Sequence, residues 1–205
     1  MNLIIDKETL LFGSFSKNPG NNGCKYFNNR FQNENINAIY KSYYSDNIAD
    51  SFNAAKTLNF GGFAISMPFK FAIVDLVDSV DEAVLDITSA NTVLIKEKKS
   101  TAYNTDWIAA SIYLENLKIE KLTILGDGGF SKAVQYACKK IHIEYDIITR
   151  KNWASISNIE NHIFNATPVD VNHKNMIDGR PHTNQGKEIA LLQAEEQYKL
   201  YSKVF

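Results

Sequence analysis

Apolar positions along the chain gather in short runs, and between these runs they recur at the spacing of helices. In the first hundred residues the runs predict strands at 10–12, 36–44, 60–67, 91–95 and 100–103. A loop rich in Gly, Asn and Ser is expected over residues 13–23, and the charged sequence KEKK predicts the turn between the last two strands. Asp46 is placed to cap a helix, and Pro68 predicts the first residue of another helix.

The second half of the chain has a different rhythm, in which strands and helices alternate. The pattern predicts strands at 121–125, 144–149 and 162–167, helices at 106–117 and 133–140, and a last helix over 187–203 after a polar loop near 170–186. Strand, helix and strand in succession predict a parallel sheet with right-handed crossovers. We therefore expect two α/β halves with a boundary near residues 106–117. The second half has room for about two βα units of ~30 residues each.

Composition and charge argue against several classes of function. The chain has 205 residues, 44% of them hydrophobic, and a formal net charge of −1. This balance argues against a nucleic-acid or membrane partner, and no run of about 18 apolar residues predicts a transmembrane helix. The N-terminal MNLIIDKETL lacks a basic start, so we expect no signal peptide. Cys24 and Cys138 stand alone, which favours a reduced, cytoplasmic protein without a metal site.

The sequence LGDGGFSKA, residues 125–133, lies between a predicted strand and a predicted helix. Gly126 permits a tight turn, and Gly128 and Gly129 let a pyrophosphate approach the backbone. The helix that follows offers free N–H groups and the positive end of its dipole to phosphates. An ordinary strand-to-helix turn is the alternative. Asp127 opposes cofactor binding, because a carboxylate ~6 Å from a phosphate costs roughly 3 kcal/mol at an effective dielectric of ~20.

The end of the next predicted strand indicates which dinucleotide is favoured. In NAD-specific sites an acidic residue at this point binds the ribose 2′-hydroxyl. This chain has Thr149, Arg150 and Lys151 instead. Two cations suit a 2′-phosphate, so the sequence favours NADP(H) over NAD(H). The alternative is a solvated basic loop.

Lys70 and Asp106 each follow a predicted strand, and the ends of these strands could share one face of the molecule. A cation in the first turn of a helix meets the positive end of the dipole, so Lys70 lacks a local structural reason. Asp106 has one, as the N-cap of the helix over residues 106–117. A Lys–Asp pair can relay a proton while a hydride moves, which is the functional interpretation.

Several motifs together carry a resemblance to a known family. They are AISMPFK (64–70), SANT (89–92), AYNTDW (102–107), LGDGGFSKA (125–133), FNATP (164–168) and GKEIALLQA (186–194). In this order and approximate spacing they are similar to the shikimate dehydrogenase family, over nearly the whole chain. The opening NPGNNGCKYFNN (18–29) resembles the shikimate dehydrogenase-like subgroup.

The resemblance implies an α/β fold of two domains. Residues 1–105 would form a substrate-binding domain, on which the helix 187–205 packs back. Residues 106–186 would form an abridged Rossmann-like parallel-sheet domain that binds NADP(H). The implied reaction is reduction of 3-dehydroshikimate to shikimate, a small-molecule substrate, by hydride from NADPH, in a monomer or homodimer.

The resemblance also implies the site residues. Lys70 matches the catalytic lysine that protonates the forming alkoxide, and Asp106 matches its partner aspartate. The implied substrate-binding residues are Ser14, Ser16, Ser66, Asn91 and Gln193. The implied cofactor-binding residues are Gly126, Gly128, Gly129, Thr149, Arg150, Lys151, Asn165 and Thr167. Asn21 and Gly23 are the alternative to the two serines for the substrate carboxylate, and Met67, Phe69 and Tyr103 are expected in packing.

The chain departs from the family pattern at several points. Ala64 stands where the family has a substrate-contacting asparagine, and one lost hydrogen bond costs about 0.5–1.5 kcal/mol. Thr149 and Lys151 replace the usual flanks of Arg150. The usual strand and helix between FNATPVDV and GKEIALLQA are missing from the pattern. A non-catalytic or weakly active binding protein for a shikimate-like acid or a nucleotide therefore stays open, as does a dehydrogenase for another alicyclic acid such as quinate.

Overall fold

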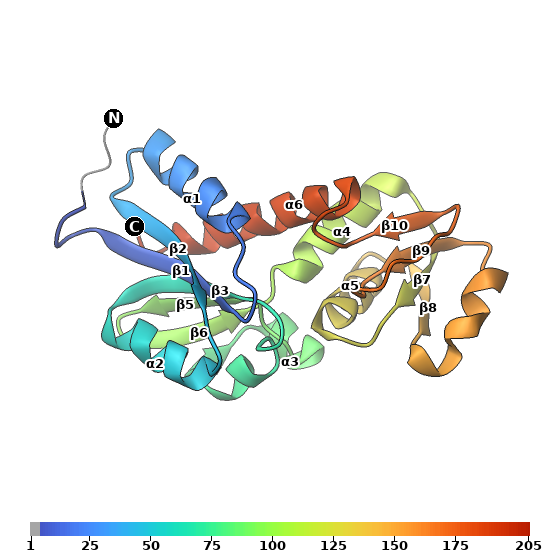
Figure 1. Cartoon of the computed structure of the whole chain (residues 1–205), viewed down its shortest axis with the longest axis horizontal. Helices are drawn as coiled ribbons and strands as arrows, with labels where there is room; N and C mark the ends of the chain where they lie inside the picture. The colour runs from blue at the N-terminus through green and yellow to red at the C-terminus, as the bar shows by residue number, and fades with distance from the viewer. Residues whose placement is uncertain (1–4) are drawn as a thin grey trace. The chain divides into compact units, whose positions relative to one another are not determined.

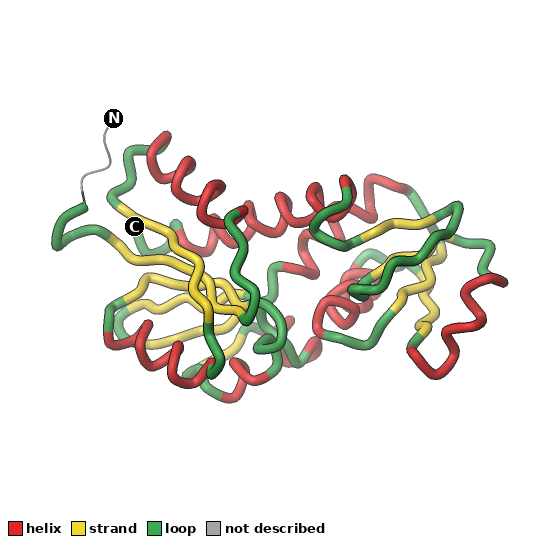
Figure 2. Tube along the Cα trace, in the orientation of Figure 1, coloured by secondary structure: helices red, strands yellow, loops and turns green. Residues whose placement is uncertain are grey.

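A computed structural model describes residues 5–205 of the chain. The N-terminal segment for which no signal peptide is predicted includes residues 1–4, which lie outside the described residues. The chain divides into two compact units. The first contains the residues up to Asn104 together with Glu196–Phe205, and the second contains Thr105–Glu195. Figures 1 and 2 show the helices and strands of each unit.

The first unit is built on a six-stranded sheet of order β2-β1-β3-β5-β6-β4. Its strands are β1 (Leu10–Ser16), β2 (Ala38–Tyr44), β3 (Phe60–Ile65), β4 (Ser79–Val80), β5 (Thr92–Lys96) and β6 (Lys99–Tyr103). Strands β2, β1 and β3 run parallel, and β5 is antiparallel to both of its neighbours. Between β5 and β6, Glu97 and Lys98 both have positive φ, as tight hairpin turns require, so the predicted KEKK turn is confirmed.

Helices cover both faces of this sheet (Figure 1). They are α1 (Asn22–Asn33), α2 (Ile48–Thr57), the short 3₁₀ helix η1 (Ala72–Asp75), α3 (Glu82–Ile87) and the end of α6 (Asn184–Tyr201). Alternate residues of β1 point to opposite faces. Phe12 packs against Phe31 of α1 and Tyr201 of α6, whereas Phe15 packs in the core that contains Phe52 of α2.

Several local predictions for the first unit were wrong. β1 continues to Ser16, although a loop was expected from residue 13. Asn47 caps α2, because its side chain accepts from Ala49 N at 2.9 Å, and Asp46 does not. Pro68 begins no α-helix: the Met67–Pro68 peptide bond is cis, and a turn over residues 67–71 precedes η1.

The second unit is built on a four-stranded sheet of order β10-β9-β7-β8, in which every pair is parallel. Its strands are β7 (Lys121–Leu125), β8 (Glu144–Ile148), β9 (His162–Asn165) and β10 (Met176–Asp178). One face packs against α4 (Asp106–Leu117), α5 (Gly129–Lys140) and the start of α6 around Leu122, Ile124 and Phe164. The other face packs against η2 (Arg150–Asn158).

The parallel sheet, β7, β8, β9 and α5 were predicted from the sequence, and their prediction is confirmed. The expected polar loop at 170–186 is wrong in part, since it contains β10, and α6 begins earlier, at Asn184. Thr105, rather than Asp106, is the N-cap residue of α4, and Asp106 is its first helical residue.

Candidate functional site

The carboxyl ends of the four strands of the second unit form one row. Leu125, Ile148, Asn165 and Asp178 end β7, β8, β9 and β10, and they are paired across the sheet in register. The loops that follow the strands therefore start at one edge. The order of strands across the sheet reverses at β7: β8 pairs on one side of β7, and β9, followed by β10, lies on the other side. Ligands of open parallel sheets bind at such a switch point, outside the carboxyl ends of the strands.

The glycine turn after β7 lies at this switch point. Gly126 has φ +108°, and a Cβ there would lie 2.8 Å from Thr167 Cγ2, so both backbone and space require glycine. The turn is held by Gly126 N, which donates to Ile148 O at 2.8 Å, and by Ser131 Oγ, which donates to Gly126 O at 2.8 Å. By contrast, a Cβ added at Gly128 would enter open space, because no atom of residues 5–205 outside the turn lies within 4 Å of it.

The start of α5 directly follows the glycine turn. Its N-cap residue is Gly128, which has no side chain to cap the helix, and the first turn holds no acidic residue. Helix starts of this kind bind phosphates through backbone N–H groups and the positive end of the helix dipole. Asp127 is exposed, and solvent screening reduces the repulsion expected of its carboxylate. The turn thus fits a dinucleotide pyrophosphate at Gly128 and Gly129.

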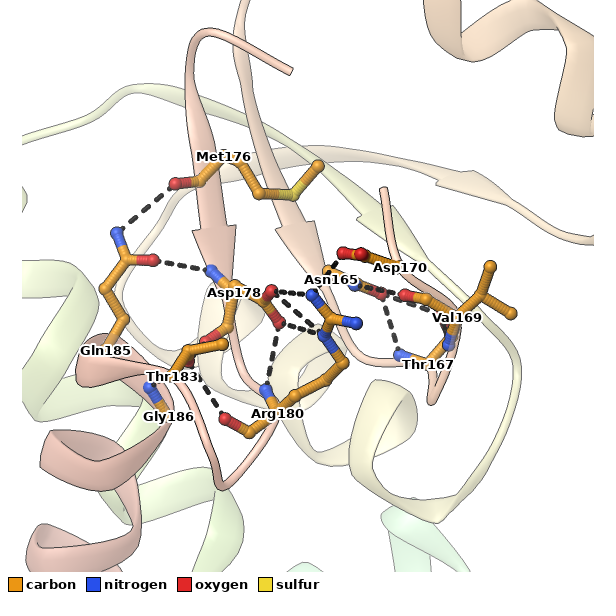
Figure 3. A network of polar contacts seen from close by, with 10 residues as sticks. All are labelled: Asn165, Thr167, Val169, Asp170, Met176, Asp178, Arg180, Thr183, Gln185 and Gly186. Atoms are coloured by element: carbon orange, nitrogen blue, oxygen red, sulfur yellow. Dashed lines mark hydrogen bonds and ion pairs between the residues drawn. The ribbon is translucent and has the colours of Figure 1, made fainter. Parts of the chain in front are cut away.

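The loop after β9 is organised by two of the expected cofactor residues (Figure 3). Asn165 is fully buried, and its Oδ1 accepts from Thr167 N at 3.1 Å and from Thr167 Oγ1 at 2.8 Å. Asn165 Nδ2 donates to Val169 O at 2.9 Å. Both side chains therefore shape the loop that packs on Gly126.

The expected phosphate-reading residues follow β8. Thr149 caps η2 through a capping box, in which its Oγ1 accepts from Lys151 N and Asn152 Oδ1 accepts from Thr149 N. The Arg150 and Lys151 side chains are exposed and form no ion pair within residues 5–205. Since β8 ends beside β7, these two cations start from the same edge as the glycine turn.

Sequence reasoning missed a buried ion pair after β10. Arg180 Nε donates to Asp178 Oδ1 and Oδ2, both at 2.9 Å, and Arg180 Nη2 donates to Asp170 Oδ1 at 2.6 Å (Figure 3). Burial acts to raise the pKa of the Asp178 carboxyl, but the hydrogen bonds from Arg180 outweigh it and hold that pKa below its ordinary value. The same bonds raise the pKa of Arg180.

In the first unit, Ser66, Lys70 and Asn91 are brought to one edge of the sheet. Lys70 is half-buried, and its carbonyl accepts from Ala90 N at 2.8 Å. Asn91 is buried, and its carbonyl accepts from Ile65 N at 2.8 Å. Lys70 lies in the turn that precedes η1, so the expectation that it faces the positive end of an α-helix dipole is wrong.

The two candidate serines lie at different depths in β1. Ser16 is buried in the last position of the strand, next to Phe15, whose carbonyl accepts from Ser66 N at 3.2 Å. Ser14 lies further inside, where its Oγ donates to Ser42 Oγ at 3.0 Å. The alternative residues lie at the start of α1: Asn21 is exposed before the helix, and a Cβ at Gly23 would lie 3.0 Å from the Tyr40 ring.

Two glutamines of α6 bond within their own units. Gln193 Nε2, an expected substrate ligand, donates to Thr105 Oγ1 at 3.2 Å in the second unit. Gln197, which sequence reasoning missed, is buried in the first unit, where its Nε2 donates to Asn91 O at 3.2 Å and Thr92 Oγ1 at 2.7 Å. Gln197 therefore holds the backbone at Asn91.

The remaining expectations concern packing, metals and membranes. Phe69 is buried as expected, but Met67 is 68% exposed, so its expected packing role is wrong. Among residues 5–205 no cluster of His, Cys, Asp and Glu is arranged to hold a metal ion. Within residues 5–205 no helix is long and apolar enough to span a bilayer.

Comparisons with known proteins give the family to which the chain is similar. Residues 23–93 match the shikimate dehydrogenase substrate binding domain. Over 144 residues, 69% of this chain, it is 32% identical to a shikimate dehydrogenase-like protein of Haemophilus influenzae, of which 53% is covered. Over 130 residues, 61% of this chain, it is 30% identical to a shikimate dehydrogenase (NADP(+)) of Methanosphaera stadtmanae, of which 46% is covered. The chain thus spans about half the length of the curated relatives it matches.

Solved structures extend the similarity to the whole fold. A shikimate 5-dehydrogenase-like protein superposes with a TM-score of 0.82 and 25% identity, over 98% of this chain and 94% of that one. The predicted α/β fold with a Rossmann-like parallel sheet is confirmed, and so is the predicted resemblance.

Proposed function

From a chain that has the fold of the shikimate dehydrogenase family and matches its substrate binding domain, we propose an NADP(H)-dependent oxidoreductase. Its substrate is 3-dehydroshikimate, reduced to shikimate, or a related alicyclic hydroxy acid. The observation that carries the proposal is the edge where β7 and β8 end. There the helix start at Gly128 and the exposed cations Arg150 and Lys151 offer a pyrophosphate seat and a 2′-phosphate seat.

The proposed chemistry divides between cofactor and protein. When bound, NADPH supplies the hydride that reduces the carbonyl carbon of the substrate. Lys70 donates a proton to the oxygen as it becomes an alkoxide, and in the reverse direction it accepts the hydroxyl proton. Asp106 is the proposed partner carboxylate and binds a substrate hydroxyl. Both side chains are at least partly withdrawn from solvent, Lys70 half-buried and Asp106 at 6% exposure, which strengthens electrostatic interactions there.

The proposed acid-binding residues lie mainly at the edge of the first sheet. Ser66 is exposed there, and Asn91 and Ser16 lie beside it. Ser14 and Gln193 complete the proposed set. Their hydroxyl and amide groups suit a polyhydroxy acid, whose oxygens both donate and accept hydrogen bonds.

The test of the reaction is consumption of NADPH by the purified protein with 3-dehydroshikimate. We expect Lys70→Ala to lower kcat by about 10²–10⁴-fold, the usual effect of losing a general acid. Lys139→Ala removes an exposed lysine of α5 and is the matched control, expected to keep the wild-type rate. A folded wild-type protein that consumes no NADPH contradicts the proposal, as does a Lys70→Ala variant of full activity.

The cofactor preference is tested separately by calorimetric titration. Replacing Arg150 and Lys151 by alanine should weaken NADPH binding by at least about tenfold and leave NADH binding nearly unchanged, because only NADPH carries the 2′-phosphate. Equal loss for both nucleotides would show that these cations do not read the 2′-position.

A second candidate function is a binding protein without catalysis for a shikimate-like acid or a nucleotide. It is favoured by Ala64, which stands in place of a substrate-contacting asparagine. Calorimetry separates the two cases, because a protein that binds the acid and binds no nicotinamide nucleotide would be a binding protein and not a dehydrogenase. A dehydrogenase for quinate or another alicyclic acid is distinguished by comparing these substrates in the NADPH assay.

A further inference from the structure

Arg180 is the centre of a polar network that joins three loops of the second unit (Figure 3). Its side chain is 13% exposed and that of Asp178 is 12% exposed, so the ion pair between them is largely withdrawn from water. Arg180 N also donates to Asp178 Oδ1 at 3.1 Å. A charge in such a place is held in one geometry, because breaking the pair would leave its partner buried and unpaired.

The first loop that this network holds is the one after β9. Arg180 Nη2 reaches Asp170 Oδ1 at 2.6 Å, while Gly179 N donates to Asn165 O at 3.1 Å. These contacts fix the loop 165–170 at both of its ends. Within it, Asn165 and Thr167 bond each other, as described above, so the loop behaves as one unit.

The loop 165–170 in turn supports the glycine turn. Ala166 N donates to Leu125 O at 3.1 Å, directly before Gly126. A Cβ on Gly126 would lie 2.8 Å from Thr167 Cγ2, which shows how closely the two backbones approach. A displacement of the loop would therefore move the turn that starts α5.

The third loop joins β10 to α6. Thr183 Oγ1 donates to Asp178 O at 2.7 Å and accepts from Gly186 N at 3.0 Å, and Gln185 Oε1 accepts from Asp178 N at 2.8 Å. Gly186 is enclosed by this loop, since a Cβ there would lie 1.9 Å from Arg180 O. The position of Arg180 is thus fixed from the α6 side as well.

We propose that Arg180 is a positioning residue for the cofactor turn. It holds the loop 165–170 against Gly126 and thereby sets the position of the backbone of residues 126–129 for a pyrophosphate. The part of this inference that concerns the cofactor rests on the proposed function. Arg180 itself bonds to carboxylates of the protein, so its effect on the cofactor is indirect.

The test compares variants at the two ends of the Arg180–Asp170 contact. Asp170→Asn removes a charge whose side chain is 89% exposed, so this variant is expected to fold. Arg180→Met removes the network, and Arg180→Lys restores one charge. The control variant is Lys121→Met, which breaks the ion pair between Lys121 and Asp146. Lys121 is the first residue of β7, so this salt bridge lies away from the carboxyl ends of the strands, where Arg180 acts.

Two readouts are measured on the full chain. We expect amide hydrogen exchange at residues 126–129 and 166–170 to rise by about tenfold in Arg180→Met and Asp170→Asn and not in Lys121→Met. We expect the Kd for NADPH to rise by about tenfold, with kcat and the KM for the acid changed far less, because a misplaced turn weakens cofactor seating. Arg180→Lys should recover part of both effects.

Unchanged exchange at residues 126–129 in folded Asp170→Asn, or in folded Arg180→Met, would overturn the inference. A wild-type chain that binds no NADPH would instead contradict the proposed function. The exchange measurement would then still decide whether Arg180 positions the turn. If Arg180→Met does not fold, the other two variants give the answer.

Discussion

A methyl group added at Gly126 and, in a second variant, at Gly128 should separate the stability of the fold from cofactor binding. Gly126 has φ +108°, where a non-glycine residue carries strain of about 1–3 kcal/mol. Its new Cβ would lie 2.8 Å from Thr167 Cγ2, and overpacking of this kind costs about 1–3 kcal/mol more. Gly126→Ala should therefore lower the free energy of unfolding by about 2–5 kcal/mol, a large part of a typical domain stability.

Gly128→Ala is the matched control, because the same methyl group enters open space. Gly128 has φ −86°, which other residues adopt without strain, and no atom of the described residues outside the turn lies within 4 Å of a Cβ added there. Loss of glycine at an N-cap costs up to about 1 kcal/mol, and reduced freedom of the unfolded chain offsets about 0.4–1 kcal/mol. Stability should stay within about 1 kcal/mol of wild type. The affinity for NADPH should fall at least about tenfold, since the methyl group lies where the pyrophosphate would approach.

Urea denaturation followed by tryptophan fluorescence measures the first effect. Trp107 and Trp153 both lie in the second unit, so the signal reports the unit that contains the turn. With a slope of about 2 kcal/mol per molar urea, Gly126→Ala should lower the midpoint by roughly 1–2.5 M. Calorimetry with NADPH measures the second effect. Equal urea midpoints for Gly126→Ala and wild type would refute the strain argument, and unchanged NADPH affinity in Gly128→Ala would refute the proposed seat.

Three further outcomes are expected. Tyr201→Phe should raise the free energy of unfolding by about 1 kcal/mol in urea denaturation, because this fully buried hydroxyl has no hydrogen-bond partner within residues 5–205; a clear loss of stability would contradict the reasoning. Ala64→Asn restores an amide on β3, and kcat/KM for 3-dehydroshikimate should rise by up to about tenfold, equivalent to one hydrogen bond of 0.5–1.5 kcal/mol; an unchanged value would show that the substrate does not reach this position. Asp78 has its pKa lowered from 3.8 to about 2, mainly by hydrogen bonds from Ser100, so its contribution to stability is present above pH 3.8 and is lost as pH falls toward about 2. The Tm difference between wild type and Asp78→Asn should shrink over that interval, and a constant difference would exclude this carboxyl as the cause.

The sequence predicted those elements whose own residues determine them. The run KLTIL, the turn at Gly126 and the helix of apolar spacing that follows it appear in the structure as β7 and α5. Here the apolar run, the glycine and the helical spacing after it all indicate a strand, a turn and a helix, and no contact with distant residues is needed to define them. The KEKK hairpin turn belongs to the same class.

Other elements depend on partners that lie far along the chain. β10 has only three residues, too few to show a period, and it exists as a strand because it pairs with β9. Asp46 and Asn47 are both good caps, and their order in the chain does not distinguish them. Pro68 suits a helix start and a turn equally well, so the position of Lys70 relative to a helix could not be derived from sequence.

The candidate site shows the same limit at the level of side chains. Sequence reasoning selected polar residues at strand ends, and those ends do lie in one row. It could not tell which side chains bond to the protein itself. Gln197 and Arg180 were missed because their partners, Asn91 and Asp170 among them, come from other elements.

The expected cofactor residues accordingly divide into two groups with different consequences. Asn165, Thr167 and Thr149 use their polar atoms to hold loops, so their loss would act on the position of the backbone. Arg150 and Lys151 are exposed, and a ligand phosphate can reach them without breaking a contact. Affinity for a dinucleotide would then come from the backbone of the glycine turn and two exposed cations, whereas the accuracy of its placement would come from the groups that hold the loops. This division explains why the Arg180 side chain lies at the edge proposed for the cofactor and yet bonds to carboxylates of the protein.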